Sequence, residues 1–180
     1  LKTDKMRYVL LNKPKGFLAS MDDPKARKTV FELAGNACKE RIYPVGQMER
    51  GSTGVLLLTN DADTAKRLTK GVNSAANIYH IVLDKPLSKK ELDTIAAGTV
   101  LEEGPVPVEE INFTDDKNKR EIGMRIHVNK PRIVRRLFAH YGFEVEQLDR
   151  VSFAGLTKKR LNRGQYRHLD SKEVGFLKMR

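Results

Sequence analysis

The stretch VGQMERGSTG at residues 45–54, followed by VLLLTND at residues 55–61, decides the fold of this chain. It predicts a polar loop that leads into a buried strand and then into the start of a helix. Its glycines allow the loop to turn tightly and to bring its backbone close to a ligand. Glu49 and Arg50 stand at its centre, and a loop carboxylate can act as a nucleophile or a base. Taken alone, the stretch fits an ordinary surface loop with a solvated Glu–Arg pair better than it fits a catalytic loop.

Composition points to a polyanionic partner. The chain has 180 residues, enough for one large domain or two small lobes, and 34 Lys and Arg against 23 Asp and Glu give a net charge of +11. The partner is nucleic acid or an anionic membrane, and the longest purely apolar run, Val55 to Leu58, is far too short to span a bilayer. No N-terminal segment resembles a secretory signal. A single cysteine, Cys38, cannot form an internal disulfide, which fits a reducing cytoplasm.

Local patterns outside the opening stretch predict both strands and helices. The predicted strands are 7–11, 77–83, 106–114 paired with 121–128, and 144–153. The predicted helices are 29–34, 60 or 61–68, one capped by Ser88 and stopped at Gly98, 131–142, and a last one capped by Asp170. Residues 21–27 are polar and predict a loop. Because strands and helices do not alternate strictly, we expect an α+β fold, with a mixed, largely antiparallel sheet and flanking helices.

Candidate binding residues lie in two basic segments and one strand. Lys13 and Lys15 flank Pro14 in a turn and either contact a phosphate or are solvated. The helix at 131–142 has an apolar stripe, and helical spacing places three arginines on its other face, where an anion or solvent would meet them: Arg132, Arg135 and Arg136. Tyr79 is either a core aromatic or a ring presented for stacking. The sequence has no zinc-ligand spacing and no phosphate-binding glycine motif.

These residues together resemble the catalytic domain of the bacterial ribosomal-RNA pseudouridine synthases of the RsuA branch. The resemblance covers nearly the whole chain. Residues 9–16 resemble the opening strand and basic turn of that family, and residues 45–61 resemble its signature, a Gly-Arg-Leu-Asp segment leading through Thr-x-Gly into Leu-Leu-Leu-Thr-Asn-Asp. Tyr79 resembles the tyrosine of the second motif, residues 132–136 the arginine-bearing third motif, and residues 148–150 the segment after it.

The resemblance implies an enzyme that isomerises uridine to pseudouridine in ribosomal RNA without a metal or an organic cofactor. By position, Glu49 would be the carboxylate that acts at the sugar, Tyr79 the ring on which the flipped base stacks, and Arg135 the partner of the carboxylate. Expected RNA contacts are Lys13, Lys15, Arg50, Arg132 and Arg136. Residues 1–180 would form one catalytic domain, a cytoplasmic monomer, and the small RNA-binding domain that usually precedes it in this branch would be absent from this chain.

Three departures from the family pattern fall on the chemistry. Glu49 stands where the family has aspartate, Gln47 where it has arginine, and Asn77 where it has lysine. Glutamate keeps the charge but adds a methylene, and a misplacement of about 1 Å can cost roughly 10²-fold in rate. The alternative hypothesis is therefore a catalytically impaired relative that binds structured RNA without modifying it. A hydrolase that uses Glu49 as a base lacks a second carboxylate at a recognisable spacing.

Overall fold

The computed structural model describes residues 5–19, 27–71 and 74–179. Its helices are α1 (Phe31–Ala34), α2 (Ala62–Thr69), α3 (Lys89–Ala96), α4 (Ile133–His140) and α5 (Ser171–Lys178). Its strands are β1 (Tyr8–Lys13), β2 (Tyr43–Pro44), β3 (Thr53–Thr59), β4 (Asn77–Leu83), β5 (Thr99–Leu101), β6 (Gly104–Val106), β7 (Glu110–Phe113), β8 (Glu121–Ile126), β9 (Val145–Phe153), β10 (Leu156–Thr157) and β11 (Tyr166–His168). None of the helices in these ranges is long and apolar enough to cross a membrane.

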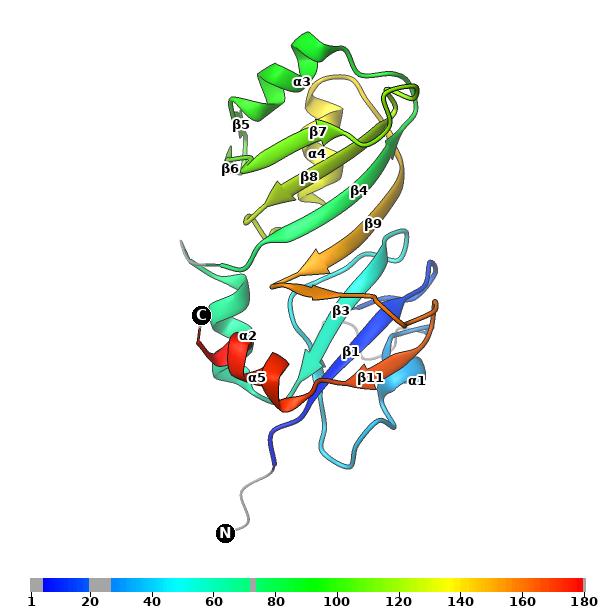
Figure 1. Cartoon of the computed structure of the whole chain (residues 1–180), viewed down its shortest axis with the longest axis vertical. Helices are drawn as coiled ribbons and strands as arrows, with labels where there is room; N and C mark the ends of the chain where they lie inside the picture. Colours follow the sequence, from blue (N-terminus) through cyan, green and yellow to red (C-terminus); the bar gives the residue numbers. More distant parts are fainter. Residues whose placement is uncertain (1–4, 20–26, 72–73, 180) are drawn as a thin grey trace.

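One long sheet runs through the described chain in the order β11-β1-β3-β9-β4-β8-β7 (Figure 1). Its strand pairs are antiparallel except β3 with β9, which run parallel at Thr53–Asp149 and Gly54–Arg150. This short parallel contact joins two halves of the sheet. Helices α3 and α4 lie with the half formed by β9, β4, β8 and β7, while α1, α2 and α5 lie with the other half (Figure 1).

The core follows from the side-chain alternation of the strands. In β1, Tyr8 and Leu10 pack on one face, whereas Val9 and Leu11 pack on the other, so that this strand is buried on both sides. In the other half, the apolar side chains of β4 and β8 pack against the apolar face of α4. The parallel junction between the halves carries the central loop of the sequence, residues 46–52, at one end.

Several sequence predictions are confirmed. The strand at residues 77–83 is observed with those bounds. Ser88 and Asp170 each form the predicted capping box, with Glu91 and Glu173 as the third helical residues. The predicted α+β class, with a mixed and largely antiparallel sheet, is also confirmed. The capping boxes depend on hydrogen-bonding groups within four residues of one another, which explains why the sequence predicts them well.

Several predicted boundaries differ from the observed ones, and two of these differences have a clear physical reason. Val106 does not continue into the β7–β8 hairpin but belongs to β6, which pairs with β5, because Pro107 has no N–H to extend a ladder. Pro131 does not open α4, which begins at Ile133, because Arg132 has a left-handed backbone with φ of 58°. The predicted loop at residues 21–27 lies, apart from Arg27, outside the described residues.

Candidate active site

Backbone hydrogen bonds hold the loop at residues 46–52 between β1 and β3. The amide of Gly16 donates to the carbonyl of Arg50 over 2.7 Å, and the amide of Ser52 donates to the carbonyl of Glu49 over 3.1 Å. The guanidinium of Arg50 donates to the carbonyls of Lys28 and Gly16. These contacts fix the loop on the rigid end of a sheet, which is where a precisely placed catalytic group needs to stand.

Lys13 is a structural residue of this loop, so the prediction that it contacts phosphate is wrong. Its side chain is fully buried, and its ammonium donates to the carbonyls of Ser52 (2.6 Å), Pro14 (3.0 Å) and Arg50 (3.4 Å). Burial lowers the pKa of Lys13 to about 8. Because the ammonium is enclosed by protein carbonyls, it has no room to meet an RNA phosphate.

Replacing Lys13 with Met is expected to destabilise the fold by about 2 kcal/mol or more at pH 7, because buried carbonyls lose their donor. The folded chain releases the Lys13 proton near pH 8 and the unfolded chain near 10.5, so between these values unfolding takes up a proton. The stability of the unmodified chain relative to Lys13→Met should therefore rise from pH 8 to 10.5. Urea denaturation at several pH values measures both effects.

Lys15→Met is the control for this experiment, because Lys15 is an exposed lysine of the same turn. It should change the free energy of unfolding by less than about 0.5 kcal/mol. A stability difference between Lys13→Met and the unmodified chain that stays flat across this pH range would show that Lys13 has an ordinary pKa.

Glu49 sits in a fork of two arginines. Arg135 donates from Nε to Glu49 Oε1, and Arg132 donates from Nη1 to Glu49 Oε2 over 3.3 Å. Ser52 adds a hydroxyl donor to Oε1 at 3.1 Å. Arg135 is itself held, because its Nη1 donates to the carbonyl of Val145 over 2.8 Å. Arg132 has a left-handed backbone, a strained conformation that persists only where the surrounding structure holds the residue in it.

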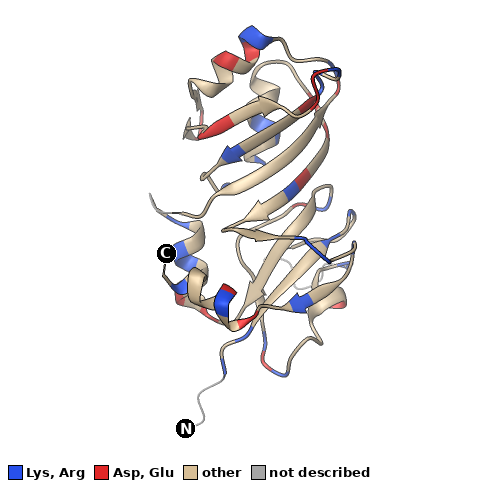
Figure 2. Ribbon diagram, viewed as in Figure 1, with Lys and Arg blue, Asp and Glu red and all other residues tan. Residues whose placement is uncertain are grey.

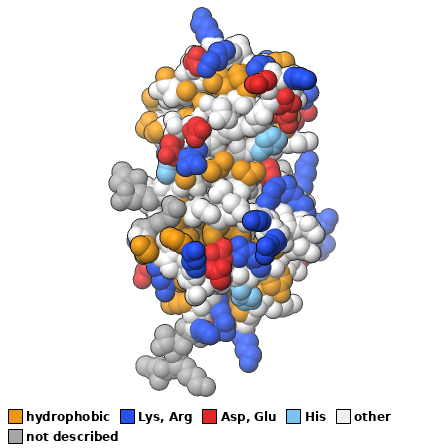
Figure 3. All heavy atoms as spheres, viewed as in Figure 1, with side chains coloured by type: hydrophobic (Ala, Val, Ile, Leu, Met, Phe, Trp, Pro, Cys, Tyr) orange, Lys and Arg blue, Asp and Glu red, His pale blue; other side chains and the backbone are white. Residues whose placement is uncertain are grey.

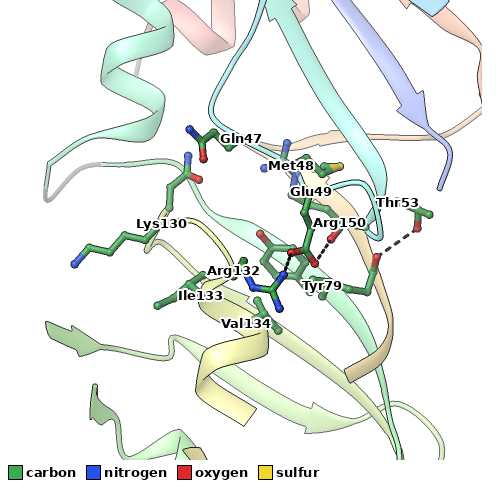
Figure 4. Close-up of a pocket in the computed structure, with 13 residues that line it drawn as sticks. Gln47, Met48, Glu49, Thr53, Tyr79, Lys130, Arg132, Ile133, Val134 and Arg150 are labelled. Carbon is green, nitrogen blue, oxygen red and sulfur yellow. Dashed lines mark hydrogen bonds and ion pairs between the residues drawn. The ribbon is translucent and has the colours of Figure 1, made fainter. Parts of the chain in front are cut away.

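Tyr79 and Glu49 line the same cleft. Tyr79 comes from β4, Glu49 from the loop before β3, and Ile133 and Val134 from the start of α4. Figure 4 shows the Glu49 carboxylate, the Arg132 guanidinium and the Tyr79 ring turned toward one another. Burial raises the pKa of Tyr79, while the positive charge of Arg150 opposes this rise. The cleft therefore presents an aromatic ring and a held carboxylate to whatever enters it.

The remaining candidates for RNA contact lie apart from one another. Arg136 is turned away from Glu49 and forms an ion pair with Glu103 at 2.9 Å. Lys15 lies beside a second hollow, with Gly51 and Arg163. The prediction that the three arginines of α4 share one face is thus only partly right, because Arg132 and Arg135 meet at Glu49 and Arg136 does not.

Two residues of the site, Ser52 and Arg150, have no role among the predictions from the sequence. The Ser52 hydroxyl donates a hydrogen bond to Glu49. Arg150 lies in the core below the cleft and is 2% exposed. Arg150 could have been recognised as unusual because it is a charged residue inside the strand at 145–153, between the buried Leu148 and Phe153. Within the described ranges no group of three or more His, Cys, Asp and Glu side chains could hold a metal ion.

Comparison with known proteins identifies the family. The RNA pseudouridylate synthase family matches residues 7–140, which include Glu49, Tyr79 and Arg135. The chain belongs to this family. A crystal structure described as a pseudouridylate synthase superposes with a TM-score of 0.83 at 26% identity, covering 97% of this chain and 75% of that one.

Curated relatives of the chain carry two different ribosomal names. The ribosomal large subunit pseudouridine synthase B of Bacillus subtilis is 34% identical over 170 residues, covering 93% of this chain and 69% of that protein. The ribosomal small subunit pseudouridine synthase A of Vibrio vulnificus is 29% identical over 172 residues, covering 93% of this chain and 72% of that protein. The chain is thus similar to synthases named for either ribosomal subunit.

Proposed function

We propose that the chain isomerises uridine to pseudouridine in ribosomal RNA, with Glu49, Tyr79 and Arg135 as its catalytic residues. The observation that carries this proposal is the carboxylate of Glu49, held by Arg135 and Arg132 and facing the ring of Tyr79 in one cleft. Membership of the RNA pseudouridylate synthase family supports the reaction type. The names of the relatives support ribosomal RNA as the substrate class. We also propose that the enzyme acts as a monomer in the cytoplasm.

The reaction needs no co-reactant, because it is an isomerisation. The bond between C1′ of the ribose and N1 of uracil breaks, the base rotates, and a bond from C1′ to C5 forms. In the proposed site the flipped uracil stacks on Tyr79, and Glu49 acts at the sugar while C1′ changes its partner. The two guanidiniums hold the Glu49 side chain in place, which positions it for that step.

Basic side chains beside the cleft provide a path for the RNA backbone. Lys and Arg occur in both halves of the molecule (Figure 2), and on one face they gather where the turn after β1 meets the segment between β10 and β11 (Figure 3). Lys15, Lys159 and Arg160 are exposed in these two segments. Thr53 lines both the cleft and the hollow beside Lys15, so the basic surface is continuous with the site. We propose that Lys15 and Arg50 contact phosphates here.

Incubation of the chain with unmodified transcripts of bacterial small- and large-subunit ribosomal RNA tests the function. Digestion, cyanoethylation and mass spectrometry would report pseudouridine, and we expect it at a defined uridine. Binding should weaken with salt, with a log–log slope of about −0.7 to −0.9 for each phosphate contact. Lys15→Ala should remove one phosphate contact and so make that slope shallower by about 0.7 to 0.9. Lys90 is an exposed lysine on α3, and Lys90→Ala should leave the slope unchanged.

Absence of pseudouridine on every transcript, together with salt-sensitive binding, would overturn the catalytic proposal in favour of an RNA-binding relative without activity. The structure offers no specific support for that alternative. Although Glu49 is longer than aspartate, it is engaged by both arginines and by Ser52.

A further inference from the structure

Within the described part of the chain, Arg150 is a buried cation that no carboxylate balances. Its Nε donates to the carbonyl of Val55 over 3.0 Å, its Nη1 donates to Asn77 Oδ1 over 3.1 Å, and its guanidinium carbon lies 4.4 Å from the centre of the Phe153 ring. All three partners are neutral. Among the residues that the structure describes, no Asp or Glu forms an ion pair with it. A buried charge without a counter-charge is costly, and a fold that retains one commonly uses it at a functional site.

A β-bulge places this cation beside Tyr79. Along the β4–β9 ladder, Ile78 is opposite Ser152, but the next residue, Tyr79, is opposite Arg150. Val151 is therefore the extra residue of the bulge. Residues directly opposite each other in a ladder point to the same face of the sheet. The bulge thus places the Arg150 side chain on the face of the sheet that carries the Tyr79 ring, and bulges next to active sites often change the direction of a side chain in this way.

The surroundings of Tyr79 favour an interaction between its hydroxyl oxygen and Arg150. Burial raises the pKa of Tyr79, the charge and the hydrogen bonding of Arg150 lower it, and the Glu49 carboxylate raises it. Arg132 and Arg135 are already engaged with Glu49. Arg150 Nη2 is enclosed and has no aligned acceptor within the described chain. Arg150 is therefore a cation of the cleft that remains available to a negative charge on the Tyr79 oxygen.

The proposed reaction requires a base that accepts a proton from C5 of uracil. Once C1′ is bonded to C5 of uracil, the C5–H bond must break, its electron pair returns to the ring, and its proton passes to a base. N1 gains a proton from solvent, so the isomerisation is balanced. Both oxygens of Glu49 already accept hydrogen bonds, from Arg135 and Ser52 at Oε1 and from Arg132 at Oε2, so they are not free to approach C5. The Tyr79 oxygen lines the same cleft and, after loss of its own proton to solvent, can accept the proton from C5.

We propose that Arg150 is a positioning residue for Tyr79: its buried, unbalanced guanidinium holds the tyrosine oxygen and stabilises the phenolate that takes the C5 proton. This inference rests on the proposed function and adds to it the residue that makes Tyr79 a base. Asn77 serves the same arrangement, because its neutral amide satisfies one guanidinium nitrogen without neutralising the charge.

Asn77→Asp tests the proposal with little change of shape. Asn77 Oδ1 already accepts from Arg150, so an aspartate there would keep the contact and balance the charge. We expect the pKa of Tyr79 to rise by about one unit or more and pseudouridine formation to slow by about 10-fold or more. Deuterium at C5 of the substrate uridine should slow the variant more than the unmodified chain, because proton removal becomes limiting. Titration of the chain labelled with ¹³C at Cζ of tyrosine, with Tyr79→Phe to assign the signal, gives the pKa without RNA.

Asn118→Asp is the matched control, since Asn118 lies in the β7–β8 turn and its Oδ1 accepts from a backbone amide. It should leave the pKa of Tyr79, the rate and the isotope effect unchanged. A Tyr79 pKa that is the same in Asn77→Asp as in the unmodified chain would overturn the proposal, as would a raised pKa with an unchanged rate. If the unmodified chain forms no pseudouridine, the proposed function fails separately. The RNA-free titration then still decides whether Arg150 stabilises the phenolate.

Discussion

Glu49→Gln is expected to reduce pseudouridine formation by about 10³-fold or more while the chain still binds RNA. The substitution keeps the shape of the side chain and removes its negative charge. Arg135 and Arg132 converge on that charge, and Ser52 orients one of its oxygens. Single-turnover formation of pseudouridine measures the loss, and RNA affinity measured alongside shows that the substrate still binds.

Two further variants define what the loss means. Glu49→Asp retains the charge and introduces the residue that the family pattern has at this position, so product formation should be retained or raised. Glu103→Gln removes a carboxylate from a comparable ion pair, with Arg136, outside the cleft, and should change the rate by less than about twofold. Product formation that survives Glu49→Gln would remove Glu49 from the mechanism and leave the family assignment standing.

Those parts of the fold that depend on short-range chemistry could be predicted from the sequence. The capping boxes at Ser88 and Asp170 are complete within four residues, and the strand at 77–83 is bounded by its own composition. The start of α4 could not be predicted in this way. Arg132 leaves the helical conformation and its side chain reaches Glu49, which is 83 residues away in the chain.

In the candidate site, too, some residues could be predicted from the sequence and others could not, because they depend on distant contacts. Glu49, Tyr79 and Arg135 could be proposed from motif resemblance, and the structure brings Tyr79 and Arg135 to the cleft of Glu49. Lys13 was wrongly assigned because a lysine at the end of a strand has the same local sequence whether it is solvated or enclosed. Arg150 was missed because its position beside Tyr79 depends on a bulge between two strands about 70 residues apart in the chain.

Gly54→Ala is expected to destabilise the chain by about 3 kcal/mol or more, or to prevent folding. Gly54 has φ of 116°, and a Cβ at this position would lie 2.1 Å from the carbonyl oxygen and 2.6 Å from the nitrogen of Arg150. These are backbone atoms of β9, which cannot move aside as the end of a side chain can. Gly54 and Arg150 are also paired at the parallel junction that joins the halves of the sheet.

The consequence should reach the candidate active site, because the junction carries both the loop of Glu49 and the arginine beside Tyr79. Separating β3 from β9 would lengthen the bond from Arg150 to Val55 and displace the cation from the tyrosine. Urea denaturation gives the stability, and Gly142→Ala is the matched control. Gly142 also has a positive φ, of 85°, but an added Cβ there meets no atom within 4 Å. Its substitution should cost only the backbone strain, about 1–2 kcal/mol. Equal losses in the two variants would mean that the close approach of β3 and β9 contributes nothing beyond that strain.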